Sequence, residues 1–508
     1  MLGLLGGLSV VTDLGTGAPL EESLRRCVVA ARLARAVGCA DPEVSEVVYV
    51  SLLQHLGCTA YAHESAGLWG DDIATVRLAF RTDFEEPTDV WRTFVAGIAE
   101  ATGTSRPRVL AKALVAGKKA DTQGGTATCE VARDASRQLG LPGSIQDALF
   151  HTMAMWNGHG QPDTAERDIP LSTRIMQVAS TATLFALHSG IDVAVSQVRR
   201  RSGTSLDPEL VDVLVDRAPE LLADIDDVDA YELALDVEPD PVRYVDDREI
   251  EDVARTFGRL VDLKSPWLHG HSTGVGDLAA DAALALGLDE HVRTVRVAGY
   301  VHDLGRVGIS SRIWDKPGPL STSERDQARL HPYYTERILS RVPALTEVAR
   351  IAGQHHERCD GSGYHRGAVA TQLTMPSRVL AAADAYRALV EGRPHRPGVA
   401  AEEAAALIEA EVKGGRLDAE AVKGVLQAAG VAPMTRRRSH PCGLTRRQVE
   451  VLRLMSNGMS NREIAKHLVI SPRTAEHHVQ DIYLKIGATS RAGAALFAME
   501  HGLLEQPG

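Results

Sequence analysis

Aromatic residues are scarce in this sequence: Phe, Trp and Tyr together make up 4% of its 508 residues. Alanine, leucine and valine are plentiful instead, a balance that favours helix packing over β-sheet. A chain of this length is too long for one hydrophobic core and predicts roughly three or four domains. We therefore expect an all-α protein with several sites on one polypeptide.

Paired cysteines and long hydrophobic runs are also lacking. The six cysteines are widely separated and form no Cys-x-x-Cys pair, which favours reduced thiols over a disulfide framework. The apolar start, residues 1–11, has no basic leader and reaches Asp13 well short of the ~20 residues of a membrane span. We expect a cytoplasmic protein with no membrane partner.

The net charge is negative over most of the chain but positive at its end. The formal charge is −12. From Thr435 onwards there are 11 Lys and Arg against 6 Asp and Glu, a balance of +5, which leaves 44 against 61, or −17, for residues 1–434. A basic tail on an acidic body indicates that only the tail meets nucleic acid.

Two stretches predict domain boundaries. Residues 222–252 hold 13 acidic residues and two arginines around the breaker Pro239-Asp-Pro241, and a basic, proline-flanked linker lies further along at Ala432–Pro441. The predicted domains are therefore 1–235, 240–430 and 444–508, with the linker at 431–443. No run of alternating strands with an acidic pocket precedes the basic tail, so we expect no phospho-receiver domain.

The first two domains resemble two copies of one helical unit. Ala34-Arg-Ala-Val-Gly38 faces Ala283-Leu-Ala-Leu-Gly287, Gln54-His-Leu-Gly57 faces His302-Asp-Leu-Gly305, Asn157-Gly-His-Gly160 faces Asp360-Gly-Ser-Gly363, and Arg174 to Ser180 faces Arg378 to Asp384. The first copy carries Glu22, Gln54, His55, Thr152, Met153 and Ser180 where the second has His271, His302, Asp303, His355, His356 and Asp384. We interpret the first copy as a structural or regulatory partner; the alternative is an unrelated helical domain.

The adjacent pair His302-Asp303 is the main candidate for metal chemistry. Consecutive helical side chains diverge by ~100°, so the pair can straddle a two-metal centre with the carboxylate as a bridge. Imidazole and carboxylate suit a divalent metal that activates water against a phosphate ester. Further ligands would come from other helices: His271, His331, His355, His356 and Asp384. Such a set could also persist as a polar core or a ligand pocket without turnover.

These residues, in this order, resemble the HD-GYP family, the cyclic-dinucleotide phosphodiesterase branch of the HD phosphohydrolases. The resemblance covers roughly residues 243–397 and includes His271-Ser-Thr-Gly-Val275, His302-Asp303, His331-Pro332, His355-His-Glu-Arg-Cys-Asp-Gly-Ser-Gly-Tyr364, Ala383-Asp384 and Arg393-Pro-His-Arg396. It implies two divalent metal ions, Fe, Mn or similar, held by His271, His302, Asp303, His331, His355, His356 and Asp384. It also implies a bridging, catalytic Asp303, with Arg306 neutralising phosphate oxygens, and no other cofactor. Glu357, Asp360 and Tyr364 are weaker candidates, because loop residues can simply cap or turn.

Three positions depart from the family pattern. Arg306 replaces the usual lysine, His365 replaces the proline of Gly-Tyr-Pro, and Trp267 stands where some members carry a glutamate for a third metal. We therefore expect at most two metals and a phosphorylated small-molecule ligand, with a cyclic dinucleotide such as cyclic di-GMP as one candidate.

Four short helices are predicted from Leu444 onwards, with helix-capping starts at Thr445, Ser460, Ser471 and Ser490. In the third helix, apolar residues at steps of four, three and four form one stripe, Ala475, Val479, Ile482 and Ile486. This pattern fits the second helix of a helix-turn-helix in the major groove of double-stranded DNA. The alternative is a protein-binding four-helix module.

Residues 444–504 resemble LuxR-type regulators, through Leu444-Thr-Arg-Arg-Gln-Val-Glu-Val-Leu452, Gly458-Met-Ser-Asn-Arg-Glu-Ile-Ala465, Ile470-Ser-Pro-Arg-Thr474 and Lys485-Ile-Gly487. The resemblance implies a DNA-binding surface made by Arg473, Thr474, Glu476, His477, Gln480 and Lys485. Glu476, His477 and Gln480 would touch bases, while Arg473 and Lys485 would hold phosphates. Such contacts discriminate by only ~1–3 kcal/mol each, so we expect a homodimer.

Three functions fit the whole chain. The first is a transcription regulator whose HD-GYP-like body senses or hydrolyses a phosphorylated ligand. The second is a metal-dependent phosphodiesterase that DNA binding merely localises, and the third is a catalytically dead HD scaffold. Metal content and turnover together distinguish them.

Overall fold

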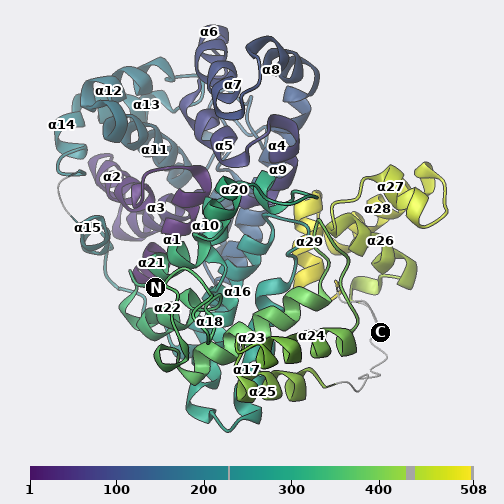
Figure 1. The fold of residues 1–508 in the computed structure, drawn as a ribbon. Helices are drawn as coiled ribbons and strands as arrows, with labels where there is room; N and C mark the ends of the chain where they lie inside the picture. Colours follow the sequence, from purple (N-terminus) through teal and green to yellow (C-terminus); the bar gives the residue numbers. More distant parts are fainter. Residues whose placement is uncertain (227–228, 431–440, 505–508) are drawn as a thin grey trace. The chain divides into compact units, whose positions relative to one another are not determined.

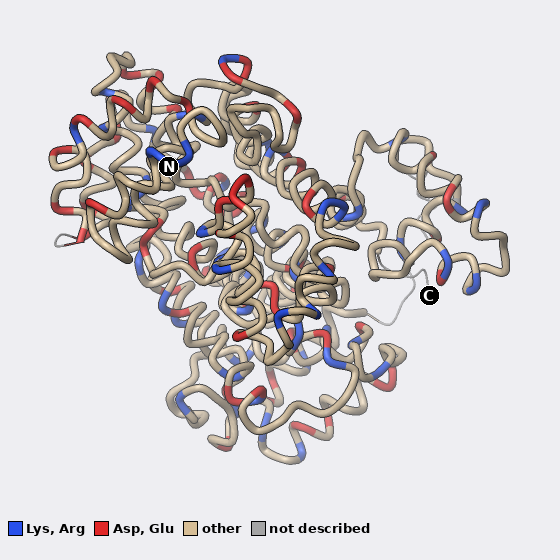
Figure 2. Tube along the Cα trace, turned by 90° about the horizontal axis from the view of Figure 1, so that it is seen from above, with Lys and Arg blue, Asp and Glu red and all other residues tan. Residues whose placement is uncertain are grey.

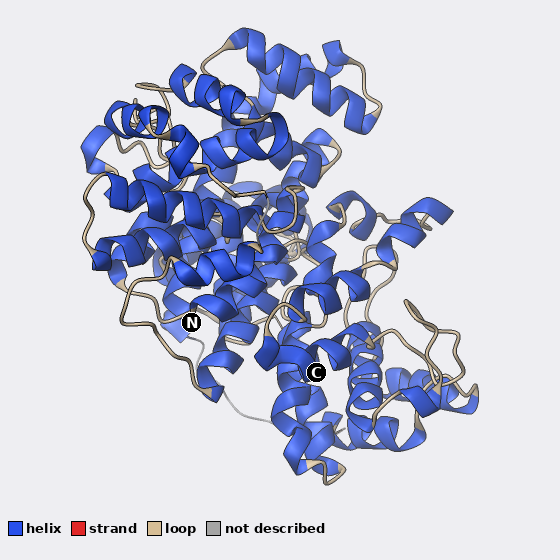
Figure 3. Ribbon diagram, turned by 90° about the vertical axis from the view of Figure 1, so that its left-hand side faces the viewer, coloured by secondary structure: helices blue, strands red, loops and turns tan. Residues whose placement is uncertain are grey.

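The computed structural model describes residues 1–226, 229–430 and 441–504 (Figure 1). These residues form helices joined by loops, and the only extended pairings among them are isolated bridges (Figure 3). The all-α prediction is confirmed. No helix in the described ranges combines the length and the apolar character needed to cross a membrane.

The chain divides into two compact units, residues 1–252 and 253–508. The division lies within helix α16 (Asp247–Asp262), beyond the acidic breaker around Pro239. Most of the predicted linker, residues 431–440, lies outside the described residues. Residues of both charge signs occur along the chain (Figure 2).

Unit 1 is built on long helices that pack around α2 and α11. Its main helices are α1 (Leu2–Thr16), α2 (Glu22–Ala36), α3 (Asp41–Leu53), α4 (Ala62–Trp69), α5 (Asp72–Arg81), α7 (Ala96–Thr102), α8 (Arg106–Lys112), α9 (Lys118–Gln138), α10 (Gly143–Phe150), α11 (Leu171–Ser189), α12 (Ile191–Arg200), α13 (Pro208–Asp216) and α15 (Ala230–Asp236). Their buried faces are mostly alanine, valine and leucine.

Unit 2 contains a helical body and four C-terminal helices. The body comprises α16, α17 (His271–Ala285), α18 (Val292–Val301), α19 (Ser311–Trp314), α20 (Thr322–Ala328), α21 (His331–Leu339), α22 (Thr346–Gly353), α23 (Met375–Val390), α24 (Ala401–Lys413) and α25 (Ala419–Ala429). The C-terminal helices are α26 (Arg446–Ser456), α27 (Asn461–His467), α28 (Pro472–Ile486) and α29 (Arg491–Glu500).

Two glycines let α17 and α18 approach closely in the body. A Cβ on Gly299 would lie 2.4 Å from the Cα of Gly276, closer than any side chain tolerates. This approach brings the first residue of α17, His271, near His302, which comes directly after the last residue of α18. The small residues therefore bring two candidate ligands together from separate helices.

A third glycine fixes the turn after α18. Gly305 packs against α21, where an added Cβ would meet the carbonyl oxygen of His331 at 2.0 Å. Thr335 of α21 ties the same turn, since its hydroxyl donates to the carbonyl of His302 and accepts from the amide of Gly305, both at 2.9 Å. The His302-Asp303 turn is thereby held against the helix that begins with His331.

The same local interactions recur in the two units. In unit 1, Asp13 accepts from the amide and hydroxyl of Ser23, and in unit 2, Asp262 accepts from the amide and hydroxyl of Ser272, each ten residues along. Burial raises the pKa of Asp13 and of Asp262 alike, in each case to about 7. The repeat seen in the sequence therefore extends to polar contacts outside the matched motifs.

Two further contacts are repeated. Arg174 bonds to the carboxylate of Asp207 at 2.6 Å, as Arg378 does to Asp418 at 2.8 Å. Gly57 packs on the carbonyl oxygen of Thr128, at 2.1 Å from an added Cβ, as Gly305 packs on that of His331. In this contact Thr128 of unit 1 stands to Gly57 as His331 of unit 2 stands to Gly305.

Gly305→Ala should lower the stability of unit 2. The new Cβ cannot fit against the carbonyl of His331, and overpacking of this kind costs ~1–3 kcal/mol. Thermal unfolding of the full chain measures the effect. Gly318→Ala is the matched control, because a Cβ there meets nothing within 4 Å; equal melting temperatures for the two variants would contradict this packing.

Candidate metal centre and DNA-binding surface

The structure brings the seven predicted ligands of unit 2 together. They come from helix ends and one helix interior: His271 begins α17, His302 and Asp303 come after α18, His331 begins α21, His355 and His356 come after α22, and Asp384 lies within α23. All are buried except His356, which is partly exposed. Residues up to 113 positions apart in the sequence thus share one interior site.

The first group of ligand atoms consists of His271, His302 and Asp384, whose donor atoms all lie within 4.8 Å of one another. The Nε2 atom of His271 is 3.3 Å from Oδ1 of Asp384, and that of His302 is 3.8 Å from the same oxygen. Neither Nε2 atom has a partner in hydrogen-bond geometry among the described residues. Buried donor atoms that converge without bonding one another fit a bound cation.

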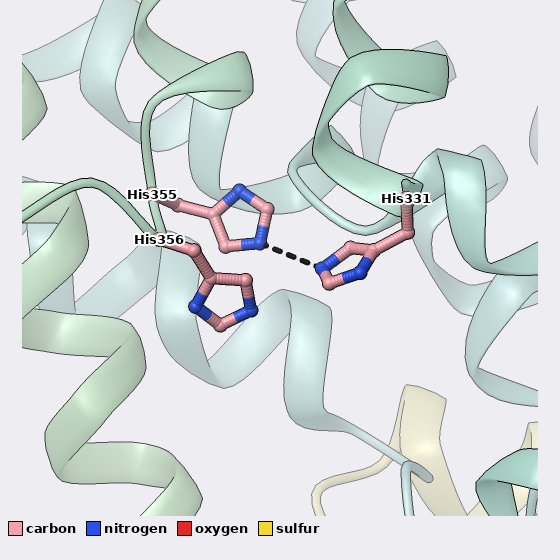
Figure 4. Close-up of side chains that lie close together, drawn as sticks. All are labelled: His331, His355 and His356. Atoms are coloured by element: carbon pink, nitrogen blue, oxygen red, sulfur yellow. Dashed lines mark hydrogen bonds between the residues drawn. The ribbon is translucent and has the colours of Figure 1, made fainter. Parts of the chain in front are cut away.

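The second group consists of His331, His355 and His356 (Figure 4). The Nε2 atoms of His331 and His355 are 3.1 Å apart, and the His356 ring lies beside them. The ligand atoms of the three imidazoles lie within 4.8 Å of one another, a grouping that suits a metal site with three histidine ligands.

Asp303 lies between the two groups and presents one oxygen to each. Its Oδ2 is 3.2 Å from Nε2 of His302, while its Oδ1 is 3.4 Å from Nε2 of His331 and 3.6 Å from Nε2 of His355. A carboxylate placed in this way can bridge two cations. The structure therefore places Asp303 between the two groups, and its bridging role stays a prediction.

The imidazoles of His302, His331 and His355 share one orientation. Each Nδ1 lies 2.6–2.7 Å from the backbone carbonyl three residues earlier. Because a carbonyl oxygen only accepts, Nδ1 carries the hydrogen and Nε2 keeps its lone pair for the site. The helix ends thus fix the tautomer that a metal ligand needs.

Glu391 is a functional candidate that the sequence analysis missed. Its Oε2 lies 2.7 Å from Nδ1 of His271, the one ligand of the first group whose Nδ1 faces no backbone carbonyl. Arg387 and Arg393 hold the same carboxylate at 2.9 and 3.2 Å. Glu391 lies just before the motif that begins at Arg393, but a carboxylate next to a motif carries no signal of its own.

The carboxylates of the site are paired with positively charged groups. Burial raises the pKa of Asp303, yet Arg306 and His302 outweigh it and hold that pKa well below the usual range. Burial likewise opposes protonation of His271, but the Glu391 and Asp384 carboxylates raise its pKa to about 9. The buried carboxylates are thus ionised next to positive charge, and the donor set of imidazoles and carboxylates fits divalent ions.

The second group is electrically different. Burial lowers the pKa values of His331, His355 and His356, so all three imidazoles are neutral near pH 7. Neutral imidazoles are the form that binds a metal ion.

Arg306 is held inside the site. Its Nε lies 2.6 Å from Oδ2 of Asp303, and its guanidinium stacks 4.6 Å from the ring centre of Trp314. The indole N–H of Trp314 donates to the backbone carbonyl of Arg306. Arg306 therefore balances the charge of Asp303 even without a phosphate in the site. The sequence analysis predicted only a contact between Arg306 and phosphate oxygens.

The loop after His356 is organised by its own carboxylates. Glu357 accepts from the amides of Arg366 and Ala368 at 2.7 and 2.8 Å, and Asp360 accepts from the amide of Ser362. These contacts give Glu357 and Asp360 a loop-forming role. Tyr364 instead packs its ring 4.7 Å from that of His356, beside the second group.

The C-terminal helices have the predicted starts and core. Capping boxes join Thr445 to Gln448 and Ser460 to Glu463, and the side chains of Ser471 and Ser490 cap α28 and α29. The predicted stripe of α28 packs into the core of these four helices, with Ile486 partly buried.

The outer side of α28 carries the predicted DNA-contacting residues. Arg473, Thr474, Glu476, His477, Gln480 and Lys485 are all exposed. Two of them also make internal contacts: the Thr474 hydroxyl bonds to that of Ser471, and the Lys485 ammonium donates to Gly443 and Gln448 at 2.9 and 2.8 Å. Lys485 thus ties the end of α28 to the start of α26.

Comparison with known proteins agrees with both parts of unit 2. Residues 255–421 match the family model of the HD domain, and residues 443–498 match that of bacterial regulatory proteins of the luxR family. A 3'3'-cGAMP-specific phosphodiesterase 3 from Vibrio cholerae is 29% identical over 413 residues, 80% of this chain and 90% of the relative. A cyclic di-GMP phosphodiesterase from Thermotoga maritima is 36% identical over 161 residues, 31% of this chain and 44% of the relative.

A solved structure extends the likeness to most of the chain. The crystal structure of a cyclic GMP-AMP specific phosphodiesterase from Vibrio cholerae matches with a TM-score of 0.59 and 24% identity, over 85% of this chain and 98% of that one. At this identity the match concerns the fold, and its extent shows that the fold of unit 1 is part of it.

Glu391→Gln should weaken metal binding without unfolding the protein. The amide keeps the size of the side chain but loses the charge that orients His271, and loss of such a partner typically costs 10–100-fold in affinity. Metal retained after dialysis against buffered Mn²⁺ measures the change. The exposed Glu403→Gln on α24 is the charge-matched control; equal metal retention by both would contradict the orienting role.

Proposed function

We propose that this chain is a DNA-binding transcription regulator whose HD domain senses or hydrolyses a phosphodiester or nucleotide ligand. The premise is that the chain contains both an HD domain, homologous to cyclic dinucleotide phosphodiesterases, and a LuxR-family domain. The observation that carries the proposal is the placement of Asp303, with one oxygen facing each group of ligands.

Two divalent ions, Fe, Mn or similar, would fit the two groups. One set of ligands is His271, His302 and Asp384, the other is His331, His355 and His356, and Asp303 is shared. When bound, such ions supply Lewis-acid stabilisation of a phosphate and an activated water. Arg306 is held beside Asp303 by Trp314, where its remaining N–H groups can bind a phosphate oxygen.

The ligand we propose is a cyclic dinucleotide. The names of the relatives specify 3'3'-cGAMP or cyclic di-GMP, and both carry the phosphodiester that the site suits. His365, in the position of the family's proline, lies against Tyr333 with ring centres 5.6 Å apart and near Glu336. This side chain is our candidate for a change in ligand preference.

Unit 1 is proposed as a degenerate HD-like copy. Supporting this are the repeated contacts of Asp13 with Ser23, of Gly57 with Thr128 and of Arg174 with Asp207. The metal ligands are replaced while these contacts persist, so the copy keeps the fold for a structural or regulatory role.

DNA binding is proposed through the exposed side of α28, as a homodimer in the bacterial cytoplasm. Glu476, His477 and Gln480 would contact bases, with Arg473 on a phosphate at the start of the helix. One such module contributes too few contacts to select a site, which is why two copies are required.

An enzyme whose DNA binding serves only localisation is the second candidate. The complete set of seven ligands favours it, because a sensor that never turns over has no need of a bridging carboxylate between two groups.

The test is metal content and turnover of the purified full chain with 3'3'-cGAMP and cyclic di-GMP. We expect bound metal, and a loss of both metal and any turnover by roughly 100-fold or more in Asp303→Asn, because the shared ligand is removed. Asp281→Asn, an exposed residue of α17, is the matched control. Wild-type protein without metal would contradict the proposed site; metal without turnover would favour sensing over hydrolysis.

Arg473→Ala should weaken binding to non-specific duplex DNA and flatten its salt dependence. Each phosphate contact contributes ~0.9 to the slope of log affinity against log salt, so the slope should fall by about that much per protomer. Lys423→Ala, an exposed charge of the HD body, should leave the slope unchanged. An unchanged slope in Arg473→Ala would exclude a phosphate contact.

A further inference from the structure

Unit 1 contains a pocket among the residues that replace the metal ligands. Glu22 and His55 line it, and they align with His271 and Asp303 of unit 2. Ser180, the counterpart of Asp384, lines it as well. The pocket is small and partly open to solvent, with about 20 Å³ available to the centre of a water molecule. The degenerate copy thus retains a hollow where the intact copy holds its ligands.

The donor set of this pocket is unsuited to a metal ion. Within the described part of unit 1, no three histidine, cysteine or acidic side chains converge as they do in unit 2. His55 instead lies against a cation, since its Nε2 is 3.1 Å from Nη1 of Arg26. Arg26 is completely buried, and its Nη2 has no hydrogen-bond partner in the described structure.

Arg26 supplies the positive charge that a metal would supply in unit 2. Its Nε donates to the carbonyl of Ser51, which fixes the guanidinium beside His55. The counterpart position in unit 2 is Val275, which packs in the core. The buried guanidinium of Arg26 would therefore take the place, in unit 1, of the metal ion proposed for unit 2.

Two arginines of α5 line the pocket itself, whereas Arg26 lies behind His55. Arg77 and Arg81 are four residues apart on one face of that helix, and neither guanidinium makes a hydrogen bond or an ion pair with another described residue. Both act on His188, whose pKa is lowered first by burial and then by Arg81 and Arg77. The two guanidinium groups thus add positive charge at the same side of the pocket.

The acidic groups nearby are too few to balance these charges. Among the described residues, Glu22 is the only acidic one lining the pocket; burial raises its pKa, against the opposing effect of Arg26, Arg77 and Arg81. Asp13, behind it, has a pKa raised to about 7 by burial. Three arginines thus lie near two carboxyl groups, those of Glu22 and Asp13, whose pKa values are raised by burial.

We propose that this pocket of unit 1 binds a phosphate-sized anion without a metal, either free phosphate or the phosphate group of a phosphate monoester. Arg77 and Arg81 would hold the oxygens in the forked geometry that guanidinium groups offer to phosphate. Phe80 and Leu184 form apolar walls beside them, against which the organic part of a monoester can pack. Unit 1 would then respond to a small phosphorylated molecule independently of the metal centre.

The test is titration of the full chain with inorganic phosphate and with GMP, at constant ionic strength and in EDTA so that no metal holds phosphate in unit 2. Calorimetry gives the affinity, and hydrogen exchange locates the protected segments. We expect protection in residues 72–81 and 171–189. Arg77→Ala/Arg81→Ala should lower the affinity tenfold or more. Glu22→Gln should retain or strengthen binding, because it removes the opposing charge.

Arg92→Ala is the matched control, since Arg92 is an exposed arginine of unit 1 outside the pocket. Thermal unfolding confirms that each variant folds. Tighter binding of GMP than of phosphate identifies a monoester as the source, and equal binding identifies free phosphate. No binding by the wild type, equal binding by the double arginine variant, or protection confined to unit 2 would overturn the proposal.

Discussion

The buried carboxylate of Asp303 is the constraint on which the HD body depends. An ionised carboxylate removed from water is costly unless positive charge surrounds it. Arg306 supplies one such charge at 2.6 Å, and the imidazoles of His302 and His331 approach the two oxygens. The glycine at 305 and the hydroxyl of Thr335 hold the turn in the place where those partners converge.

On the proposal that unit 1 is a degenerate HD-like copy, it keeps the fold without that carboxylate. With His55 in place of Asp303, no buried anion requires two metal ions, and one arginine, Arg26, fills the interior with fixed charge. The framework contacts survive because they satisfy backbone and capping groups that every copy of the fold must satisfy. Asp13 bonding to Ser23 is such a contact, and it has no dependence on metal. Loss of ligands and persistence of the fold are therefore compatible.

The sequence predicted most of the features that depend on residues close together in the chain. The capped starts at Thr445 and Ser460 and the apolar stripe of α28 result from short-range rules, and the structure confirms them. The order of the motifs likewise predicted seven candidate ligands, and the structure brings their side chains together. Glu391 and Arg26 could not be predicted, because each acts through a partner far away in sequence, His271 in one case and His55 in the other. A lone charged residue carries no periodicity that would reveal such a partner.

The surface of α28 limits how the two parts of unit 2 can work together. Lys485 donates to Gly443 and Gln448, so its ammonium is held at the end of α28, whereas the exposed Arg473 lies at the start of the helix. Glu476 adds a negative charge to the same face, tolerable where it accepts from a cytosine amino group. Because phosphate contacts supply most non-specific affinity, a single module with this charge pattern binds weakly. On the proposed function, occupancy of DNA would depend on pairing two modules, and a ligand that alters their pairing would alter transcription without contacting α28.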